Sequence, residues 1–436
     1  MAKDANVIVI GAGAAGLAAA AQLGHAGLSV LILEARDRVG GRMFTQHDSG
    51  CSYPIELGAE FIHGLAPEIW QPLQKAGASI AEVSGQPWCV GNGQICPCDF
   101  FDEVDDILTK MDDQSPDESF LSFLGRRCPQ ASEKAKQRAL GYVTGFNAAD
   151  PALVGVHWLV QEMKAEETIE GDRAFRAKSG YAGLVELLRQ ELSASVTIRT
   201  EVVVEKIRWG LGRVEISAGG TLGFSADRAL ITLPLAVLQA PPGTRAAIAF
   251  DPGLPRQKVE AMEKLEMGNV MRVVLRFRQR FWEAISPAMN KTLANMSFLF
   301  SNDEWFPTWW TTMPDRFPII TGWAPFRSAD RLSNQNREFV VGRAVDTLGT
   351  LLRIDAGKLH GQLKAAYYHD WQSDPFSRGA YSYGKVGSDR AQALLGAPVE
   401  NTIFFAGEAT DVSGHNGTVH GAIASGHRAA AEILRG

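Results

Sequence analysis

A glycine-rich turn between an apolar strand and a helix, close to the N-terminus, is the feature that most constrains the fold. The run Val7–Ile10 is short, continuous and rich in β-branched residues, which is typical of a strand buried on both faces of a parallel sheet. The sequence GAGAAG follows at 11–16, and the alanine-rich segment after it predicts a helix over 17–23. A second buried strand is expected at 29–33, with Glu34 at its end. Together these elements predict a dinucleotide-binding βαβ unit.

Each conspicuous residue of this unit has a physical role. Gly11 permits the tight turn, Gly13 lets the backbone approach a pyrophosphate, and Gly16 lets the helix pack closely on the strand. The helix N-terminus offers unpaired N–H groups to the phosphates. Glu34 can accept hydrogen bonds from a ribose 2′-hydroxyl, and its charge disfavours a 2′-phosphate. The unit alone leaves NAD and FAD equally open.

The segments that follow favour FAD. EARDRVGGR at 34–42 and ELGAEFIHG at 56–64 resemble the extended signature of the flavin amine oxidase family, which includes monoamine oxidases, polyamine oxidases and lysine-specific histone demethylases. AGEAT at 406–410, which follows a strand expected at 402–405, and GTVHGA at 417–422 resemble the C-terminal block of the same family. With intermediate blocks, the resemblance covers essentially the whole chain.

The resemblance implies a non-covalently bound FAD, because Ala380 stands where covalently flavinylated members carry a cysteine. Arg42 would offer a forked set of donors to the pyrophosphate, Glu408 would contact the ribityl-phosphate portion, and Val204 would contact the adenine. The residues assigned to the cofactor in this way, or through the glycine-rich turn, are Gly11, Gly13, Ala15, Gly16, Glu34, Ala35, Arg36, Gly40, Gly41, Arg42, Leu57, Gly58, Ala59, Glu60, Val204, Trp371, Gly407, Glu408, Thr418, Val419 and Ala422.

The implied fold class is α/β: a Rossmann-like FAD-binding domain built from discontinuous segments, plus an α+β substrate domain, as in amine oxidases and p-hydroxybenzoate hydroxylase. We expect residues 1–77, 176–244 and 371–436 in the FAD-binding domain and residues 78–175 and 245–370 in the substrate-binding domain. The segment 78–175 carries acidic clusters and few β-branched runs, so it is predicted to be helical.

The part between the two insertions predicts one helix and several strands. A glycine turn and the spacing of the leucines predict an amphipathic helix within 176–192. Strands are expected at 196–199, 201–207, 213–217 and 229–233. These segments complete the expected FAD-binding domain.

A strand expected at 271–278 carries the first candidate catalytic residue. In the resembled family a lysine in this strand holds a water against flavin N5, nine residues before a Phe-Trp pair. Here Phe281-Trp282 stands nine residues after Arg272, so an arginine replaces the lysine. Arg272 would hold the water less well, giving a slow oxidase or a dehydrogenase that uses another acceptor. Alternatively, its planar fork would bind a substrate carboxylate, or it would pair with a neighbouring acid.

Three further residues complete the catalytic candidates. Tyr381 matches one of the two tyrosines that flank the substrate amine in monoamine oxidases, and the second position falls on Thr418, so half an aromatic cage is expected. His63 matches a histidine of polyamine oxidases and would position the amine or handle a proton; a histidine merely hydrogen-bonded in a loop is the alternative. The aromatic run at 305–310, with Trp323, is a candidate pocket wall, although buried core is the commoner fate of such residues.

The implied reaction is the oxidation of an amine. The carbon bearing the amine gives a hydride equivalent to flavin N5, the imine hydrolyses, and O2 or another acceptor reoxidises the flavin. The alternatives are an amino-acid oxidase that uses Arg272 as a carboxylate clamp, a flavin desaturase that acts on a C–C bond, and a flavoprotein scaffold whose chemistry has decayed. The substrate stays open, because His63 favours a polyamine, the tryptophans an arylalkylamine and Arg272 an amino acid.

Composition bounds the partners and the compartment. The 43 Lys and Arg against 49 Asp and Glu give a net charge of −6, which argues against broad binding to nucleic acid or an anionic membrane. No long apolar run and no signal peptide are visible, so we expect a cytoplasmic protein whose partners are a small-molecule amine and an electron acceptor. The five cysteines, Cys96 and Cys98 among them, are expected to be incidental thiols, and no metal site is expected. The oligomeric state stays open.

Overall fold

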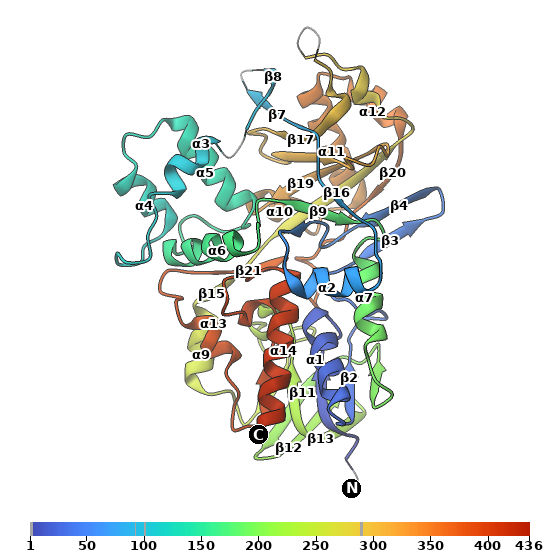
Figure 1. The fold of residues 1–436 in the computed structure, drawn as a ribbon, viewed down its shortest axis with the longest axis vertical. Helices are drawn as coiled ribbons and strands as arrows, with labels where there is room; N and C mark the ends of the chain where they lie inside the picture. Colours follow the sequence, from blue (N-terminus) through green and yellow to red (C-terminus); the bar gives the residue numbers. More distant parts are fainter. Residues whose placement is uncertain (1–2, 92, 100–101, 288–290) are drawn as a thin grey trace.

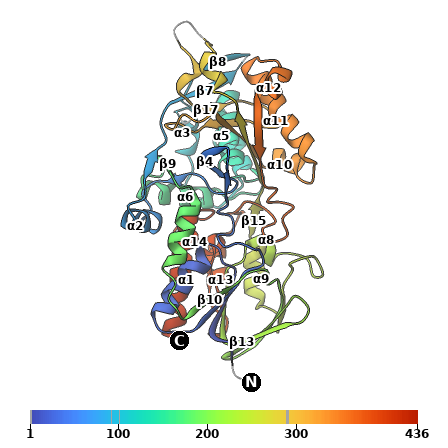
Figure 2. The ribbon, with the colours of Figure 1, turned by 90° about the vertical axis from the view of Figure 1, so that its right-hand side faces the viewer.

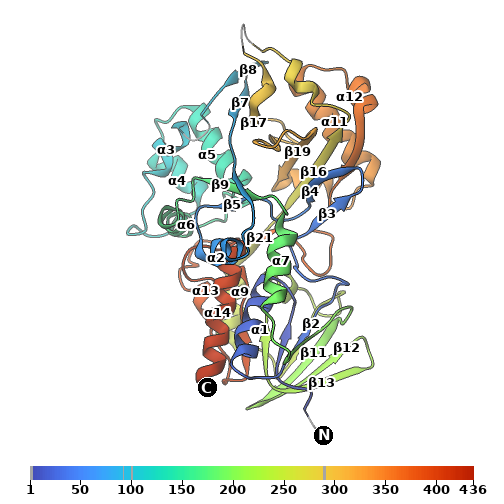
Figure 3. The ribbon, with the colours of Figure 1, turned by 45° about the vertical axis from the view of Figure 1, so that its right-hand side comes forward.

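Two lobes, each built around one sheet, make up the elongated molecule (Figure 1). The computed structural model describes residues 3–91, 93–99, 102–287 and 291–436. An eight-stranded sheet forms the centre of the lobe that carries both termini, and a seven-stranded sheet forms the centre of the other lobe (Figures 1 and 3).

The eight-stranded sheet has the order β10-β2-β1-β13-β12-β11-β14, and β22 also pairs with β13. β1 runs parallel to both β2 and β13, as the βαβ motif predicts. Its strands are β1 (Ala5–Ile10), β2 (Val30–Leu33), β10 (Val196–Arg199), β11 (Val204–Gly210), β12 (Arg213–Ala218), β13 (Leu222–Ile231), β14 (Ala249–Asp251) and β22 (Ile403–Phe405). The helices in or beside this lobe are α1 (Ala14–His25), α2 (Pro67–Lys75), α7 (Tyr181–Gln190), α8 (Leu235–Leu238), α9 (Arg256–Glu263), α13 (Ala391–Gly396) and α14 (Val419–Arg435).

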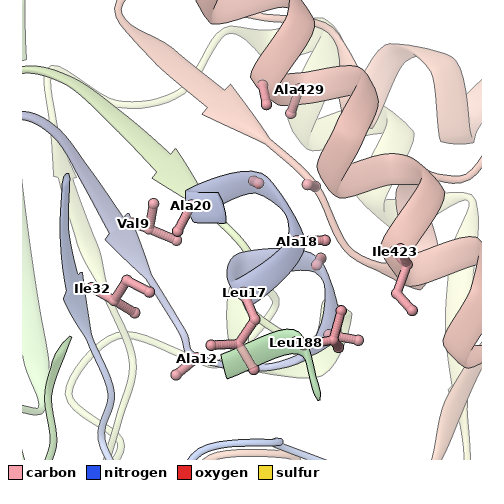
Figure 4. Close-up of a cluster of buried hydrophobic side chains, with 14 of the residues drawn as sticks. Val9, Ala12, Leu17, Ala18, Ala20, Ile32, Leu188, Ile423 and Ala429 are labelled. Carbon is pink, nitrogen blue, oxygen red and sulfur yellow. The ribbon is translucent and has the colours of Figure 1, made fainter. Parts of the chain in front are cut away.

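Helices from the two ends of the chain cover one face of this sheet. α1 packs between the sheet and α14, so Leu17 lies near the strand residues Val9 and Ile32, while Ile423 approaches from the α14 side (Figures 2 and 4). Because successive strand residues point to opposite faces, Ile8 belongs to a second core on the other face, beneath β11 and β12. The two cores fix the position of the glycine-rich turn between β1 and α1.

The seven-stranded sheet has the order β20-β16-β19-β18-β17-β7-β8. Its strands are β7 (Gln86–Gly91), β8 (Gln94–Pro97), β16 (Val270–Phe277), β17 (Met296–Phe300), β18 (Thr308–Thr311), β19 (Ile319–Pro325) and β20 (Leu363–Tyr367). The helices α10 (Arg327–Leu332), α11 (Arg337–Leu352) and α12 (Ala356–Gln362) lie beside it. The alternation predicted for β16 is confirmed, because Met271, Val273, Leu275 and Phe277 all belong to the core of this lobe.

The first insertion is only partly helical. The helices α3 (Asp102–Leu108), α4 (Phe120–Arg127), α5 (Glu133–Gly145) and α6 (Val156–Thr168) share a core of their own. However, β6 (Ile80–Glu82), β7, β8 and β9 (Ala174–Ala177) also lie in the segment predicted to be helical. β7 is a strand because it pairs with β17, about two hundred residues away, a partner that local sequence does not reveal. No helix in the described part of the chain is long and apolar enough to cross a membrane.

Short sheets join the lobes. The hairpin of β3 (Thr45–Asp48) and β4 (Cys51–Glu56) is one, and β5 (Ile62–His63) with β6 and β9 is another. β15 (Leu265–Gly268) pairs with β21 (Tyr381–Gly384). The segment 56–64, which the resemblance placed at the flavin, and Tyr381, which it placed beside the substrate amine, are therefore held at the junction of the two lobes.

The strands and the helix predicted around the glycine-rich turn are all present, although the helix runs from Ala14 to His25 and not only over 17–23; two later strand boundaries are also wrong. The strand predicted at 201–207 begins only at Val204, and the strand predicted at 229–233 is the end of the ten-residue β13. The first part of β13 carries Gly223 and charged residues, and it is a strand because it forms an antiparallel pair with β12.

The cysteines are not all free thiols. Cys89 and Cys98 form a disulfide across the hairpin of β7 and β8, so the expectation of incidental thiols is wrong for these two residues. Cys96, with Cys51 and Cys128, is free. The Cys-Pro-Cys spacing singled out Cys96 and Cys98, but the disulfide partner of Cys98 is Cys89 in the facing strand β7.

Candidate active site

A cavity of about 1250 Å³ takes its lining from both lobes. The glycine-rich turn, the segment 57–60, strands of the seven-stranded sheet and helices α5 and α6 all contribute to its walls. Every residue that the sequence assigned to the cofactor lines this cavity, except Gly16. The structure thus gathers segments from residue 11 to residue 422 around one space.

The glycine-rich turn has the form that a pyrophosphate requires. A Cβ at Gly13 would meet no atom within 4 Å, so the backbone there is open to a ligand. Gly13 is also the N-cap of α1 and makes no side-chain capping bond, which leaves the first N–H groups of the helix available to an anion. Gly16 does not line the cavity because it serves packing: a Cβ there would lie 2.0 Å from the carbonyl oxygen of Gly11.

Glu34 is held firmly at the end of β2. Its two carboxylate oxygens accept hydrogen bonds from the backbone N–H of Ala12, at 2.8 Å, and of Arg36, at 2.9 Å. The carboxylate is buried and lines the cavity, as does Val204, the first residue of β11. A fixed acid at the end of β2 suits the ribose of a dinucleotide.

Arg42 and Glu408 form a second anchoring point. Nη1 of Arg42 donates to Glu408 Oε1 at 2.9 Å and to the carbonyl oxygen of Ala380 at 2.7 Å. The other oxygen of Glu408 accepts from Ser382 Oγ at 2.6 Å and from the N–H of Gly417 at 3.0 Å. Within the described residues, Nη1 is the only nitrogen of Arg42 with a protein partner, so its other donors suit phosphate oxygens. Glu408 is occupied in holding Arg42 in place.

The segment 57–60 is pressed against Arg42 and Trp371. A Cβ at Gly58 would lie 1.8 Å from the carbonyl oxygen of Arg42, so only glycine fits there. Trp371 is buried and donates from its indole nitrogen to the carbonyl oxygen of Leu57 at 2.7 Å. The open helix end, the donors of Arg42 and this close-packed strip together fit an extended flavin dinucleotide.

Arg272 is buried and paired with Glu60. Its Nη2 makes an ion pair with Glu60 Oε2, and its Nη1 donates to the carbonyl oxygen of Gly58 at 2.6 Å. Glu60 also binds Arg176, at 2.7 Å, and the indole nitrogen of Trp310, at 3.1 Å. Burial alone raises the pKa of Glu60, but the charges of Arg272 and Arg176 hold it below its usual value. Of the three interpretations of Arg272, the structure shows the pairing with an acid.

Tyr381 and Thr418 both line the cavity, but their hydroxyl groups have different roles. The hydroxyl of Tyr381 donates to the carbonyl oxygen of Phe146 at 2.7 Å, which fixes its ring. Burial, with the nearby charge of Glu162, raises the pKa of Tyr381. The hydroxyl of Thr418 caps α14, because it accepts from the N–H of Gly421 and donates to the carbonyl oxygen of His415.

His63 supplies part of the aromatic wall. Its ring lies edge-on to Phe146, with centroids 5.4 Å apart, and 6.1 Å from the ring of Phe61. Burial lowers the pKa of His63, so the imidazole is neutral near pH 7. The sequence did not single out Phe146 or Phe61, because their role depends on contact with the ring of His63 in the fold.

The aromatic run at 305–310 is mostly core. Phe306 and Trp309 are fully buried in the hydrophobic core of the seven-stranded sheet, which is the commoner of the two fates considered for this run. Trp310 and Trp323 do line the cavity. The reason is strand alternation: Trp309 and Trp310 are neighbours in β18 and so point to opposite faces.

Two carboxylates of α6 that the sequence analysis missed also line the cavity. Both oxygens of Glu162 accept hydrogen bonds from Asn147 Nδ2, at 2.7 and 2.6 Å, and burial with the charge of Glu166 raises the pKa of Glu162 to about 8. Burial would raise the pKa of Glu166 as well, but His415 and the neighbouring histidines hold it below its usual value. The i,i+4 spacing of the two glutamates was the available signal, since it places both on one face of a helix.

The lining of the cavity is strongly acidic away from the flavin segments. Among the described residues that line it, the cationic side chains other than histidine are Arg36, Arg42 and Arg272, each in contact with an acid. The carboxylates that line it beyond Glu34, Glu60 and Glu408 are Asp99, Asp105, Glu162, Glu166, Glu167, Glu170 and Asp172. This part of the cavity attracts cations and repels anions.

Comparison with known proteins agrees with this site. The family described as flavin containing amine oxidoreductase matches residues 14–88 and 103–434. Probable polyamine oxidase 4 of Arabidopsis thaliana is 27% identical over 464 residues, which cover 99% of this chain and 87% of that protein. Lysine-specific histone demethylase 1 homolog 2 of Oryza sativa subsp. japonica is 29% identical over 455 residues, which cover 99% of this chain but only 57% of the demethylase.

Solved structures show the same fold. Putrescine oxidase bound to putrescine has a TM-score of 0.81 at 21% identity, and cyclohexylamine oxidase from Brevibacterium oxydans IH-35A has a TM-score of 0.78 at 20% identity. Each comparison covers 99% of both chains, which confirms the predicted α/β two-domain fold class. Because the family model matches most of its residues, the chain belongs to the flavin containing amine oxidoreductase family and is an FAD-dependent amine oxidase.

Proposed function

We propose that this enzyme oxidises a diamine or polyamine whose second cationic group is held by carboxylates of the helical insertion. The observation that carries this proposal is the acidic lining described above, whose described residues include no lysine and no arginine apart from Arg36, Arg42 and Arg272, each already in contact with an acid. Several carboxylates in a partly desolvated space attract an ammonium group, whereas they repel the carboxylate of an amino acid.

The order of the residues supports a substrate that extends from the flavin towards α3. Glu162 acts electrostatically on both Tyr381 and Tyr142. Tyr142 also feels the charges of Glu166 and Asp105, and burial with these carboxylates raises its pKa. Glu162 keeps its proton near neutral pH, so the charge that a polyamine would meet beyond Tyr381 comes from Glu166 and the other acidic residues towards α3.

The residues near Tyr381 would orient the reacting amine. Bound FAD supplies the oxidising chemistry, because it accepts a hydride equivalent from the carbon that bears the amine, after which water hydrolyses the imine. The fixed ring of Tyr381 and the neutral ring of His63 offer π faces, and the imidazole of His63 can accept a hydrogen bond from the amine. Trp310 and Trp323 exclude water from this part of the cavity.

The same proposal includes the way FAD is held, the electron acceptor, the compartment and the extent of the FAD-binding domain. FAD is held without a covalent bond, which is supported by Ala380 and by the lack of cysteine among the described lining residues. O2 or another acceptor reoxidises the flavin. We expect reoxidation by O2 to be slow, because Arg272 replaces the family lysine and is paired with Glu60. We retain the cytoplasm as the compartment. We also retain residues 1–77, 176–244 and 371–436 as the FAD-binding domain, to which β14 adds a strand from the segment expected to bind substrate.

The alternative functions lose support. A carboxylate clamp needs a free planar fork, but both Nη nitrogens of Arg272 already have protein acceptors. A desaturase or a decayed scaffold would not need an acidic cavity of this kind.

Anaerobic reduction of the flavin tests the proposal. Putrescine, spermidine and spermine are compared with benzylamine, phenethylamine and a set of amino acids at equal concentration. We expect diamines or polyamines to bleach the flavin at the lowest concentration. Equal or better reduction by the monoamines or amino acids would show that the carboxylates do not select the substrate.

A further inference from the structure

Three potential metal ligands from distant parts of the chain meet at the cavity wall. Glu166 lies on α6, His415 lies in the loop before α14, and His420 lies in the first turn of α14. Helix α6 passes above the N-terminal end of α14 (Figures 1 and 3). Glu166 and His420 line the cavity, whereas His415 stands behind them.

The potential ligand atoms of these three residues lie close together, and several of them lack hydrogen-bond partners. Nδ1 of His415 lies 3.8 Å from Glu166 Oε1, and one ligand atom of each of the three residues lies within 4.8 Å of the other two. Glu166 Oε2, His415 Nδ1 and His420 Nε2 are all buried and have no hydrogen-bond partner. The side chain of His420 is 3% exposed. Buried polar atoms without partners are rare, so this convergence points to a missing ligand.

The loop that carries His415 is fixed by its own hydrogen bonds. Asp411 accepts from the N–H of His415 at 3.1 Å, and the carbonyl oxygen of His415 accepts from Thr418 at 2.7 Å. A Cβ at Gly414 would lie 2.7 Å from the carbonyl oxygen of Gln161, so the loop is in close contact with α6. The separation of His415 from Glu166 is therefore set by the fold.

We propose that Glu166, His415 and His420 bind a divalent metal ion of the zinc type. Two imidazoles and one carboxylate are a common zinc ligand set, with bonds of about 2.0–2.2 Å that place the ligand atoms roughly 3.3 Å apart in a tetrahedron. The present separations are longer, so binding of the ion would draw the three side chains together by rotation. Three protein ligands would leave a fourth position, and two of the three, Glu166 and His420, line the cavity.

A second group of potential ligands provides a matched contrast. Asp117, His157 and Asp389 also lie within metal-binding distance of one another. However, both ring nitrogens of His157 are already used, at 2.8 Å from Asp389 Oδ1 and 2.7 Å from the carbonyl oxygen of Ser115. This second group is satisfied by protein contacts, so a metal ion is assigned only to the first.

The metal would oppose a cationic substrate. It would neutralise Glu166 and place positive charge beside the acidic lining, so it would weaken the binding of a diamine. This consequence rests on the proposed function, whereas the metal site itself does not.

Zinc uptake by the FAD-loaded full-length protein tests the site in the absence of any amine. Protein stripped with a chelator is dialysed against buffered free Zn²⁺, and bound zinc is measured by mass spectrometry. We expect one zinc per chain, and X-ray absorption at the zinc edge should show two imidazoles. His415→Ala should weaken zinc binding by at least the 10- to 100-fold that loss of an outer-shell partner typically costs. His157→Ala should bind zinc as the wild type does.

Equal zinc binding by the wild type and His415→Ala, or a zinc shell without imidazole, would overturn the site. His415→Asn, with flavin content and melting temperature as checks, guards against a folding defect in the alanine variant. A steady-state assay then separates the two proposals: zinc should raise the KM for putrescine in the wild type only. Zinc that binds with two imidazoles but leaves that KM unchanged would confirm the site and contradict the role of Glu166 in substrate binding.

Discussion

Arg272 and Glu60 form a buried ion pair on the cavity wall, at the position where the resembled family carries a lysine. Arg176 binds the second oxygen of Glu60. The pair joins β16 of one lobe to the segment 57–60, which also contacts Arg42. One carboxylate thus fixes two arginines at the junction of the lobes.

Arg272→Lys should change flavin reoxidation more than flavin reduction. A lysine is shorter and presents a compact ammonium, so it frees space for a water beside the flavin. We expect reoxidation by O2 to become about tenfold faster, which is about 1.4 kcal/mol of barrier, while reduction by amine changes little. Stopped-flow absorbance measures both half-reactions, and Arg272→Met is the uncharged control. A loss confined to amino-acid substrates would instead favour the carboxylate clamp.

Glu60→Gln should destabilise the protein strongly. It leaves Arg272 and Arg176 buried without their shared counter-charge, and breaking a buried ion pair costs about 3–5 kcal/mol. The matched control is Glu82→Gln, which breaks an exposed pair with Arg173 and should change the stability little. Urea unfolding of the FAD-loaded protein measures both. Equal losses in the two variants would show that the buried pair has no special role.

Arg42→Gln should weaken FAD binding. A hydrogen bond to a charged group contributes about 1.5–3 kcal/mol, so we expect roughly 10- to 150-fold weaker binding. Reconstitution of the apoprotein, followed by flavin fluorescence, measures the affinity. Arg213→Gln, at an exposed pair on β12, should bind FAD normally. An unchanged affinity in Arg42→Gln would remove this arginine from the cofactor site.

Glu162 should make stability depend on pH. Its pKa is raised from 4.5 to about 8, so the folded protein binds this proton more tightly than the unfolded chain. The resulting stabilisation is complete below pH 4.5 and is lost as the pH rises through about 8. Glu162→Gln is neutral throughout and should show a flatter fall of melting temperature between pH 5 and 8. Parallel curves for the two proteins would mean that Glu162 is ionised in the folded state.

Glu166→Gln should reduce selectivity for diamines. Loss of one carboxylate contact should raise the KM for putrescine by about tenfold, which is 1.4 kcal/mol, while the KM for a monoamine changes little. The assay includes a chelator, so that the charge effect is measured without metal. Glu133→Gln, on the exposed side of α5, is the control. An equal rise for the monoamine would indicate a general disturbance of the cavity.

The flavin-binding half was predictable because its signals are local. Gly13 and Gly16 lie three residues apart in the turn that they shape, and Glu34 follows within one βαβ unit. Their roles depend on backbone geometry that the sequence itself fixes.

The substrate half was not predictable for the opposite reason. Arg272 meets Glu60 across more than two hundred residues, and Trp310 lines the cavity while its neighbour Trp309 lies in the core. β7 pairs with β17 from about two hundred residues away, as well as with its hairpin partner β8. Most of the acidic lining lies in one stretch, from Glu162 to Asp172 in and just after α6, but nothing within that stretch shows that it faces the cavity.

Helix α14 packs on α1 although almost the whole chain separates them. During synthesis, the glycine-rich turn leaves the ribosome long before Glu408, Thr418 and the other C-terminal lining residues exist. A nascent chain therefore has one wall of the cofactor site and lacks the other. We therefore expect flavin to bind only after both walls of the site exist, and a product truncated before residue 406 should not retain the cofactor.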